Sequence, residues 1–281
     1  MRSPVPAVTG PGRTGAPRCR PFAAVVDRFV PARRHDASVT PEQIFWMAHD
    51  GLPREAPGSV DTTRQLLRLA GPLAPRPRVL DVGCGTGAAS LVLAADTGGT
   101  VLAVDVHRPF LVRLRAAAAE AGLGHRIHPV AASMFDLPVA DGSVDLLWAE
   151  GSAYLMGFDA ALAAWRRLLS PSGALVLTEA EWTTTTPATG ARAFWETGYP
   201  VMRALDGNAR AALDRGWRVL ATYQLPESDW AGYYDPLARR LDVLRARGVD
   251  PAALDEVGRE IDIWRRHGAD YGYTGFVLRP R

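Results

Sequence analysis

The residues with the clearest chemical potential lie in one glycine-rich turn. An apolar run ends at Asp81, and Gly83, Cys84, Gly85 and Gly87 belong to the turn that follows. Glycine tolerates positive φ and lets the backbone approach a ligand closely. The small and helix-forming residues after the turn predict a helix, whose free N–H groups favour an anion. This combination predicts a ligand site at the end of a strand.

A second acidic residue extends this site. Residues 100–105 read as a strand that ends at Asp105, about twenty residues after the turn, where a ribose-binding carboxylate is expected. NAD enzymes use the same geometry, but their fingerprint is Gly-x-Gly-x-x-Gly, whereas this chain has Gly-x-Gly-x-Gly. The spacing therefore predicts a cofactor that carries a ribose.

At these residues the chain resembles the class I S-adenosylmethionine-dependent methyltransferases. Residues 80–87 look like the first motif of that family, Asp105 looks like its second acidic motif, and residues 136–147 look like its passage from strand three to strand four. Three later stretches, 148–154, 225–227 and 271–274, resemble a bacterial subfamily that acts on small molecules. The resemblance runs from about Ile44 to the C-terminus and implies S-adenosyl-L-methionine as the cofactor.

The resemblance also implies which residues hold the cofactor. They are Gly58, Ser59, Asp81, Gly83, Cys84, Gly85, Gly87, Asp105, Val106, Ser133, Met134, Phe135 and Glu150. Ser133 stands where the family commonly has an Asp that reads the adenine amino group, and a hydroxyl accepts a weaker, neutral hydrogen bond. Met134 and Phe135 can still cover the ring. For Ser59, plain helix capping is an equally good interpretation.

The expected substrate region is rich in aromatic and acidic residues. The candidates for substrate binding are Tyr154, Glu179, Trp182, Trp195, Tyr199, Trp230 and Tyr271. Aromatic faces and carboxylates together favour a cationic or amine-bearing guest, although each ring alone could simply pack the protein. Glu150 ends the fourth strand, so with Tyr154 it is our candidate catalytic residue, to orient or deprotonate the nucleophile. Alternatively, Glu150 holds the cofactor or caps the next turn.

The pattern of elements predicts an α/β fold, a doubly wound and mostly parallel seven-stranded sheet. Strands are expected at residues 79–82, 100–105, 127–130, 144–148, 174–178, 217–225 and 273–278. Helical insertions are expected near residues 183–210 and 229–268, as a substrate cap. The resemblance implies that the two helices before the first strand, from residues 41 and 60, form a lid over the cofactor.

Composition restricts the setting of this site. We expect one methyltransferase domain over residues 41–281, after a Pro-, Arg- and Gly-rich extension at residues 1–40 that is poorly ordered. The net charge of +2 argues neither for nor against nucleic acid. No apolar run reaches transmembrane length, so a cytoplasmic protein without a membrane partner is expected. The histidines, from His49 to His267, show no metal-ligand spacing.

Several functions are compatible with this site. The leading one is methylation of a small molecule on N, O or C, with N slightly favoured. A nucleic-acid methyltransferase would want an Asn/Asp-Pro-Pro-Tyr motif after strand four, where this chain has residues 149–152, Ala-Glu-Gly-Ser. A protein arginine methyltransferase would want a second glutamate beside Glu150. A cofactor-binding protein without catalysis is the remaining alternative. We therefore expect a small-molecule substrate, no nucleic-acid partner, and a monomer or homodimer.

Overall fold

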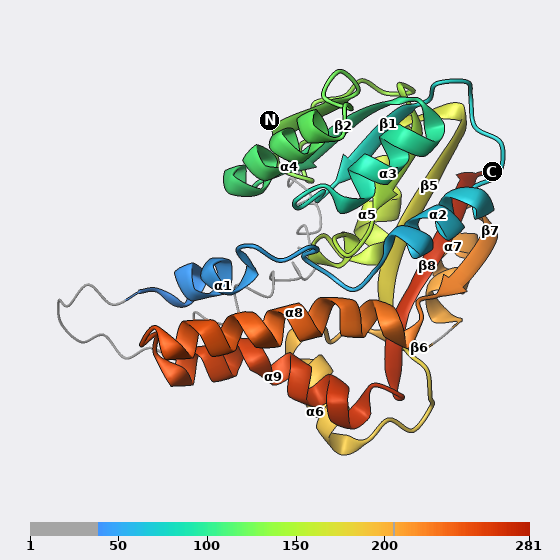
Figure 1. Ribbon diagram of the computed structural model, residues 1–281. Coiled ribbons are helices and arrows are strands. Elements are labelled where there is room, and N and C mark those ends of the chain that lie inside the picture. The colour runs from blue at the N-terminus through green and yellow to red at the C-terminus, as the bar shows by residue number, and fades with distance from the viewer. Residues whose placement is uncertain (1–38, 205) are drawn as a thin grey trace, which may run out of the picture.

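The computed structural model describes residues 39–204 and 206–281, and Figure 1 shows a twisted sheet flanked by helices with further helices beyond one end. The extension expected at residues 1–40 lies almost wholly outside the described residues. Within the two described ranges, no helix combines the length and the apolar character needed to cross a membrane.

The chain alternates strands and helices through its first two thirds. The helices are α1 (Pro41–His49), α2 (Val60–Leu69), α3 (Ala88–Thr97), α4 (Arg108–Glu120), α5 (Phe158–Trp165), α6 (Thr189–Gly198), α7 (Gly207–Asp214), α8 (Glu227–Ala246) and α9 (Pro251–His267). The strands are β1 (Arg78–Val82), β2 (Thr100–Asp105), β3 (Ile127–Ala131), β4 (Val144–Ala149), β5 (Leu169–Trp182), β6 (Arg203–Ala204), β7 (Trp217–Gln224) and β8 (Tyr271–Pro280). Short 3-10 segments lie at Ala153–Leu155 and Arg166–Leu168.

The sheet confirms the predicted doubly wound α/β fold. Its strand order is β3-β2-β1-β4-β5-β8-β7, and β6 pairs with the end of β5. All neighbours are parallel except β8, which runs antiparallel to both β5 and β7. The predicted seven strands are present, and the two-residue β6 is an addition. The order reverses between β1 and β4, the point at which such sheets bind ligands.

Helices cover both faces of the sheet. On one face, α2, α3 and α4 bury Leu66, Leu93 and Leu114 against β1, β2 and β8. On the other face, α5 and α7 bury Leu162 and Ala212 against β4, β5 and β8. Each large apolar side chain removed from water stabilises the fold by about 1.5–3 kcal/mol. These two faces hold the strand ends, and hence the loops that follow them, in fixed positions.

A cap with its own apolar core lies beyond the carboxyl ends of β1 and β4. It consists of α1, α6, α8 and α9, and Ile44, Trp195, Leu237 and Ile261 are among its buried residues. Figure 1 shows α8 and α9 side by side, with α6 against α9 and α1 near their far ends. The long strands β5 and β8 extend into this cap, so the sheet and the cap share a continuous support.

The structure differs from the sequence prediction mainly in the lengths and roles of elements. Strand β5 continues to Trp182 because it pairs with β8 all the way to that residue. The two N-terminal helices separate: α1 joins the cap, whereas α2 packs on the sheet beside α3. The connection between them supplies Arg54, Glu55 and Ala56 to the cleft described next, and α1 supplies Phe45 and His49 to a second cavity beside it. Helix α7 begins within the helical insertion expected near 183–210 and continues to Asp214, beyond the predicted end.

Candidate functional site

A cleft opens at the switch point of the sheet, between the loops that follow β1 and β4. It is lined by Arg54, Glu55 and Ala56 from the α1–α2 connection, by Asp81, Gly83, Cys84, Gly85, Thr86, Ala88 and Ala89 from β1 to α3, and by Glu150 and Gly151 after β4. Five residues predicted to bind the cofactor therefore lie together: Asp81, Gly83, Cys84, Gly85 and Glu150. The lining holds the carboxyl groups of Glu55, Asp81 and Glu150 and the guanidinium of Arg54.

Two of the turn glycines serve different purposes. Gly83 has a φ of +71°, and a Cβ there would lie 2.4 Å from the Cβ of Ser152. Gly83 therefore permits the loops after β1 and β4 to approach each other at the cleft. Gly87 has a φ of +87°, and a Cβ there would lie 2.0 Å from Cδ1 of Leu114 in α4. Gly87 is thus required for packing against α4 and does not line the cleft.

Several polar groups of the turn form hydrogen bonds within the protein. The N–H groups of Gly83 and Cys84 both donate to the carbonyl of Val104, at 2.8 and 3.0 Å. The hydroxyl of Ser90 donates to Oδ2 of Asp81. Burial nevertheless raises the pKa of Asp81 to about 7, despite that hydrogen bond. Asp81 therefore shapes the turn as well as bordering the cleft.

Asp105 is oriented by two backbone donors. The N–H of Gly85 donates to its Oδ2 at 2.9 Å, and the N–H of His107 donates to its Oδ1 at 2.8 Å. Each carboxylate oxygen can accept a further hydrogen bond, so the group remains able to bind a vicinal diol. Next to it, Val106 and Phe135 expose 68% and 69% of their surfaces at the ends of β2 and β3. Such exposed apolar side chains suit the faces of a nucleoside base.

The loop after β3 supplies the other two expected adenine contacts. Ser133 accepts a hydrogen bond of 3.2 Å from the N–H of Phe135, so its hydroxyl shapes the loop and can still donate. The side chain of Met134 reaches the glycine turn, where its Cε would lie 3.9 Å from a Cβ on Gly83. None of Val106, Ser133, Met134 and Phe135 is among the residues that line the cleft, and of these four Met134 has its side chain near the glycine turn.

Replacing Asp105 with alanine is expected to raise the dissociation constant of S-adenosylmethionine at least about tenfold. Hydrogen bonds to a charged group are worth about 1.5–3 kcal/mol each, and this variant loses those to the ligand. Calorimetry measures the change, with circular dichroism to verify folding. Asp141→Ala, in an exposed ion pair with Arg167, is the matched control and should bind normally. Equal affinity in a folded Asp105→Ala protein would contradict the assignment.

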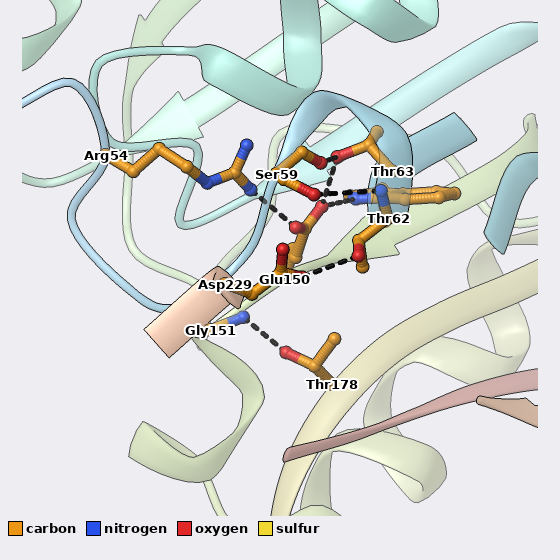
Figure 2. A network of polar contacts seen from close by, with 9 residues as sticks. Arg54, Ser59, Thr62, Thr63, Glu150, Gly151, Thr178 and Asp229 are labelled. Atoms are coloured by element: carbon orange, nitrogen blue, oxygen red, sulfur yellow. Dashed lines mark hydrogen bonds and ion pairs between the residues drawn. The ribbon is translucent and has the colours of Figure 1, made fainter. Parts of the chain in front are cut away.

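Glu150 lies at the centre of a polar network (Figure 2). The guanidinium of Arg54 forms an ion pair with its Oε1, and the side chains are only 14% and 4% exposed. The hydroxyl of Thr63 and the indole N–H of Trp148 donate to Oε2, at 2.9 and 3.1 Å. A Cβ on Gly58 would lie 2.5 Å from Oε1. Both oxygens of Glu150 therefore have partners within the protein, and Gly58 makes room for the pair.

Further contacts in Figure 2 tie this network to the cap and the sheet. Ser59 caps α2 by accepting a 3.1 Å hydrogen bond from the N–H of Thr62. The Thr62 hydroxyl donates to Asp229 at the start of α8. The N–H of Gly151 donates to the hydroxyl of Thr178 in β5 at 2.7 Å. Gly58 and Ser59 thus position the α1–α2 connection, and neither lines the cleft.

A second cavity lies between the cleft and the cap. It is lined by Phe45, His49, Glu55, Ala56, Pro57, Gly151, Tyr154, Ala180, Trp195, Gly198, Tyr199, Tyr233, Leu237, Val257, Glu260 and Tyr273. Six of these residues carry Phe, Tyr or Trp rings, two carry carboxyl groups, and none is an arginine. Three of the predicted substrate residues, Tyr154, Trp195 and Tyr199, belong to this set.

Glu55, Ala56 and Gly151 line both cavities. The side chain of Glu55 lies over the glycine turn, with its Cγ 3.1 Å from a Cβ built on Gly85. Both of its carboxyl oxygens are buried and have no hydrogen-bond partner of ordinary geometry among the described residues. Burial raises the pKa of Glu55 to about 8, while Arg113 and Thr86 act in the opposite direction. The two cavities therefore share the side chain of Glu55, whose pKa is raised to about 8.

Comparison with known proteins agrees with this architecture. Residues 79–173 match the family described as methyltransferase domain. This match runs from β1 into β5, includes the glycine turn and Asp105, and agrees with the resemblance to the class I S-adenosylmethionine-dependent methyltransferases. The structure of a methyltransferase from Geobacter sulfurreducens in complex with S-adenosyl-L-homocysteine superimposes with a TM-score of 0.74 at 20% identity, covering 85% of this chain and 98% of that chain. At that identity the likeness establishes the fold.

The curated relatives differ in the atom that they methylate. A dimethylglycine N-methyltransferase from Parasynechococcus marenigrum (strain WH8102) is 37% identical over 125 residues, 44% of this chain and 45% of that protein. A nocamycin O-methyltransferase from Saccharothrix syringae is 39% identical over 120 residues, 41% of each protein. C-methyltransferases also match. The chain matches the dimethylglycine and nocamycin methyltransferases over less than half of their lengths, so they do not decide its substrate.

Four predicted substrate residues of the methyltransferase do not line the cavity. Trp182, Trp230 and Tyr271 pack against one another behind it, with ring centroids of Trp230 and Tyr271 5.7 Å apart. Glu179 is buried in β5, where its Oε1 accepts a hydrogen bond from the N–H of Ala180. These residues support the cavity wall. The sequence could not separate them from lining residues because all are aromatic or acidic.

Glu55, Tyr233 and Glu260 line the second cavity and are not among the predicted site residues. A signal for one of them was present, since Ala253, Val257, Glu260 and Trp264 recur at helical spacing and place an acid on an apolar face of α9. His49 also lines this cavity. Its Nδ1 lies 2.8 Å from the Phe45 carbonyl, and its Nε2 lies 2.9 Å from the Tyr233 hydroxyl. Within the described ranges, no group of three metal-ligating side chains is found.

The buried Glu179 predicts a pH-dependent stability. Burial raises its pKa to about 8 in the folded protein, against about 4.5 when unfolded. The folded state therefore binds the proton more tightly, and this stabilisation is lost as the pH rises through 8. Urea unfolding at pH 6 and pH 9 should show a smaller loss of stability for Glu179→Gln than for the wild type. The exposed Glu196→Gln variant is the control and should retain the full loss.

Proposed function

We propose that this chain transfers a methyl group from S-adenosylmethionine to a small molecule, and that the acceptor atom is an amine nitrogen. The observation that carries the proposal is the shared edge of Glu55, Ala56 and Gly151 between the cleft at the switch point and the aromatic cavity. Two ligands bound in these spaces would meet at that edge. Transfer between two ligands requires this kind of juxtaposition.

The residues of the cleft fit the proposed cofactor. When bound, S-adenosylmethionine supplies a methyl group activated by a sulfonium. Asp105 would accept hydrogen bonds from the ribose hydroxyls, and Val106 and Phe135 would cover the adenine. Arg54 is the cation of the cleft and would face the carboxylate of the cofactor. The structural relative in complex with S-adenosyl-L-homocysteine supports this assignment.

The aromatic cavity favours nitrogen as the acceptor. Rings of Phe45, Tyr154, Trp195, Tyr199 and other residues surround two carboxyl groups and no arginine. Aromatic faces attract cations, and more strongly when water is excluded. Burial raises the pKa of Tyr154 above its usual range, so its phenol stays neutral and its ring face remains attractive to a cation. An amine fits this environment better than an acid or a neutral polyol.

We assign the two glutamates of the cleft different roles. Glu55 has free oxygens at the shared edge and a pKa of about 8, so it would take the proton from the amine at one of its Oε atoms. Glu150 has both oxygens occupied, and it would position Arg54 and the α1–α2 connection. The sequence-based hypothesis, in which Glu150 itself acts on the nucleophile, stays open to the variants described in the Discussion.

Calorimetry and a labelled-methyl assay test the proposed function. S-adenosylmethionine is expected to bind with a micromolar dissociation constant, and label from its methyl group should reach members of a panel of small amines. Matched alcohols and phenols are the controls for N against O transfer. Failure to bind the cofactor would contradict the proposal outright. Transfer to the phenols alone would retain the methyltransferase activity and overturn the choice of nitrogen.

A further inference from the structure

A second carboxyl group lies in the aromatic cavity away from the cofactor cleft. Glu260 of α9 lines this cavity and is absent from the lining of the cleft, whereas Glu55 lines both. The hydroxyl of Tyr234 donates to Oε1 of Glu260 at 2.6 Å. The ion pairs of the described residues include none to Glu260. The cavity thus has one acid at the shared edge and a second acid that does not line the cleft.

The surroundings of Glu260 offer no cation of their own. The basic side chain among the lining residues is His49, and burial lowers its pKa to about 4, so it is neutral at physiological pH. Its Nδ1–H would donate to Phe45 and its Nε2 would accept from Tyr233, which leaves neither nitrogen free. A buried carboxylate without a cation is costly, and burial accordingly raises the pKa of Glu260, while the hydrogen bond from Tyr234 acts in the opposite direction. A positively charged group of a ligand would relieve that cost.

The aromatic rings between the two acids suit the same ligand. Tyr233 and Tyr273 line the cavity together with Glu260, and burial and the Glu260 charge raise both of their pKa values above the usual range. Their rings therefore remain neutral and can contact alkylammonium or alkyl groups by their faces. The apolar side chains of Leu237 and Val257 also line this cavity. A chain of methylene or aromatic carbons fits such a wall.

We propose that the substrate is a diamine or a related amine with a second cationic group, one end at Glu55 for methylation and the other held by Glu260. This inference rests on the proposed function and names its substrate class. Glu55 would face the nitrogen that loses its proton, and Glu260 would pair with the nitrogen that keeps its charge. Glu260 in this assignment is a specificity residue, and no group is transferred to it.

Binding of α,ω-diamines tests the inference without turnover. We would titrate the S-adenosyl-L-homocysteine complex with diamines of four to eight carbons and with amino alcohols of equal length, following binding by calorimetry. At the best chain length, the diamine is expected to bind about ten- to a hundredfold more tightly, the value of one charged hydrogen-bonded contact. Glu260→Gln should abolish this preference. Glu256→Gln, an exposed acid on the same helix, should retain it.

Several outcomes would overturn the inference. The inference is wrong if the wild type binds diamine and amino alcohol equally at every chain length. It is also wrong if a folded Glu260→Gln protein still prefers the diamine. If Glu260→Gln does not fold, Glu260→Asp replaces it, because aspartate keeps the charge. We expect Glu260→Asp to keep the preference for the diamine. Loss of that preference in Glu260→Asp would contradict the proposal. If label is transferred to monoamines and no diamine is preferred, the substrate class is wrong and the proposed function stands. If S-adenosyl-L-homocysteine does not bind, the proposed function fails instead.

Discussion

A Glu55→Gln variant is expected to turn over its substrate about a hundredfold more slowly than the wild type at pH 8 or above. A positioned general base contributes about a hundredfold or more, and a glutamine of the same size cannot accept the proton. The wild-type rate should also rise with pH through about 8, because Glu55 must be deprotonated to act and burial holds its pKa there. In the variant this rise should disappear, since the group that titrates is gone.

The measurement is a pH–rate profile at saturating cofactor, with cofactor affinity determined separately. The control is Glu42→Gln, an exposed glutamate of α1 that lies outside both cavities. It should preserve both the rate and the profile. A variant at Glu55 that keeps the rise near pH 8 would show that another group is the proton acceptor. A variant that loses cofactor affinity alone would place Glu55 with the cofactor-binding residues.

The parts of the site that could be predicted are those whose signals are local in sequence. The turn from Asp81 to Gly87 and the carboxylate of Asp105 follow strands that are apolar and short, and their spacing reflects one strand–helix–strand unit. The structure places the N–H of Gly85 2.9 Å from Asp105, so the two motifs form one site. Exposure of Val106 and Phe135 at the neighbouring strand ends follows from the same unit.

The parts that could not be predicted depend on contacts between distant segments. Arg54 meets Glu150 across 96 positions, and His49 meets Tyr233 across 184. No periodicity or motif encodes such pairs, because they arise only when the cap packs on the sheet. The importance of Glu55 follows only from the folded structure, in which the α1–α2 connection places it in the lining of both cavities. Its neighbours in the sequence, Arg54 and Ala56, would suggest an ordinary exposed loop.

The ends of the elements were harder to predict than their types, because they too depend on contacts between distant segments. The core of β5 around Val176 is apolar and reads as a strand, but its extension to Trp182 is stabilised by pairing with β8. The helical pattern after Trp230 was visible, yet its division into α8 and α9 depends on residues 247–250. A turn of this kind places α9 against α8 and thereby brings Glu260 to Tyr234.

Arg54→Met is expected to lower the free energy of unfolding by about 3 kcal/mol. The ion pair with Glu150 is buried, and removal of one partner from such a pair costs about 3–5 kcal/mol because the other charge is left uncompensated. The Thr63 and Trp148 donors would remain and keep the loss near the lower value. The double variant Arg54→Met/Glu150→Gln should recover much of this stability, since no isolated charge then remains.

Arg78→Met is the control for the comparison of Arg54→Met with the double variant. Its ion pair with Asp145 has an N–O distance of 3.0 Å, and the Arg78 side chain is 59% exposed. Solvent-exposed pairs contribute only about 0–1 kcal/mol. Urea unfolding of the single and double variants measures the coupling energy.

The single variant Glu150→Gln distinguishes the two roles considered for that residue. If Glu150 positions Arg54, the dissociation constant of S-adenosylmethionine should rise while turnover at saturating cofactor survives. A hundredfold fall in turnover with unchanged affinity would instead support the sequence-based hypothesis, because only contact with the nucleophile would slow the chemistry without weakening the cofactor.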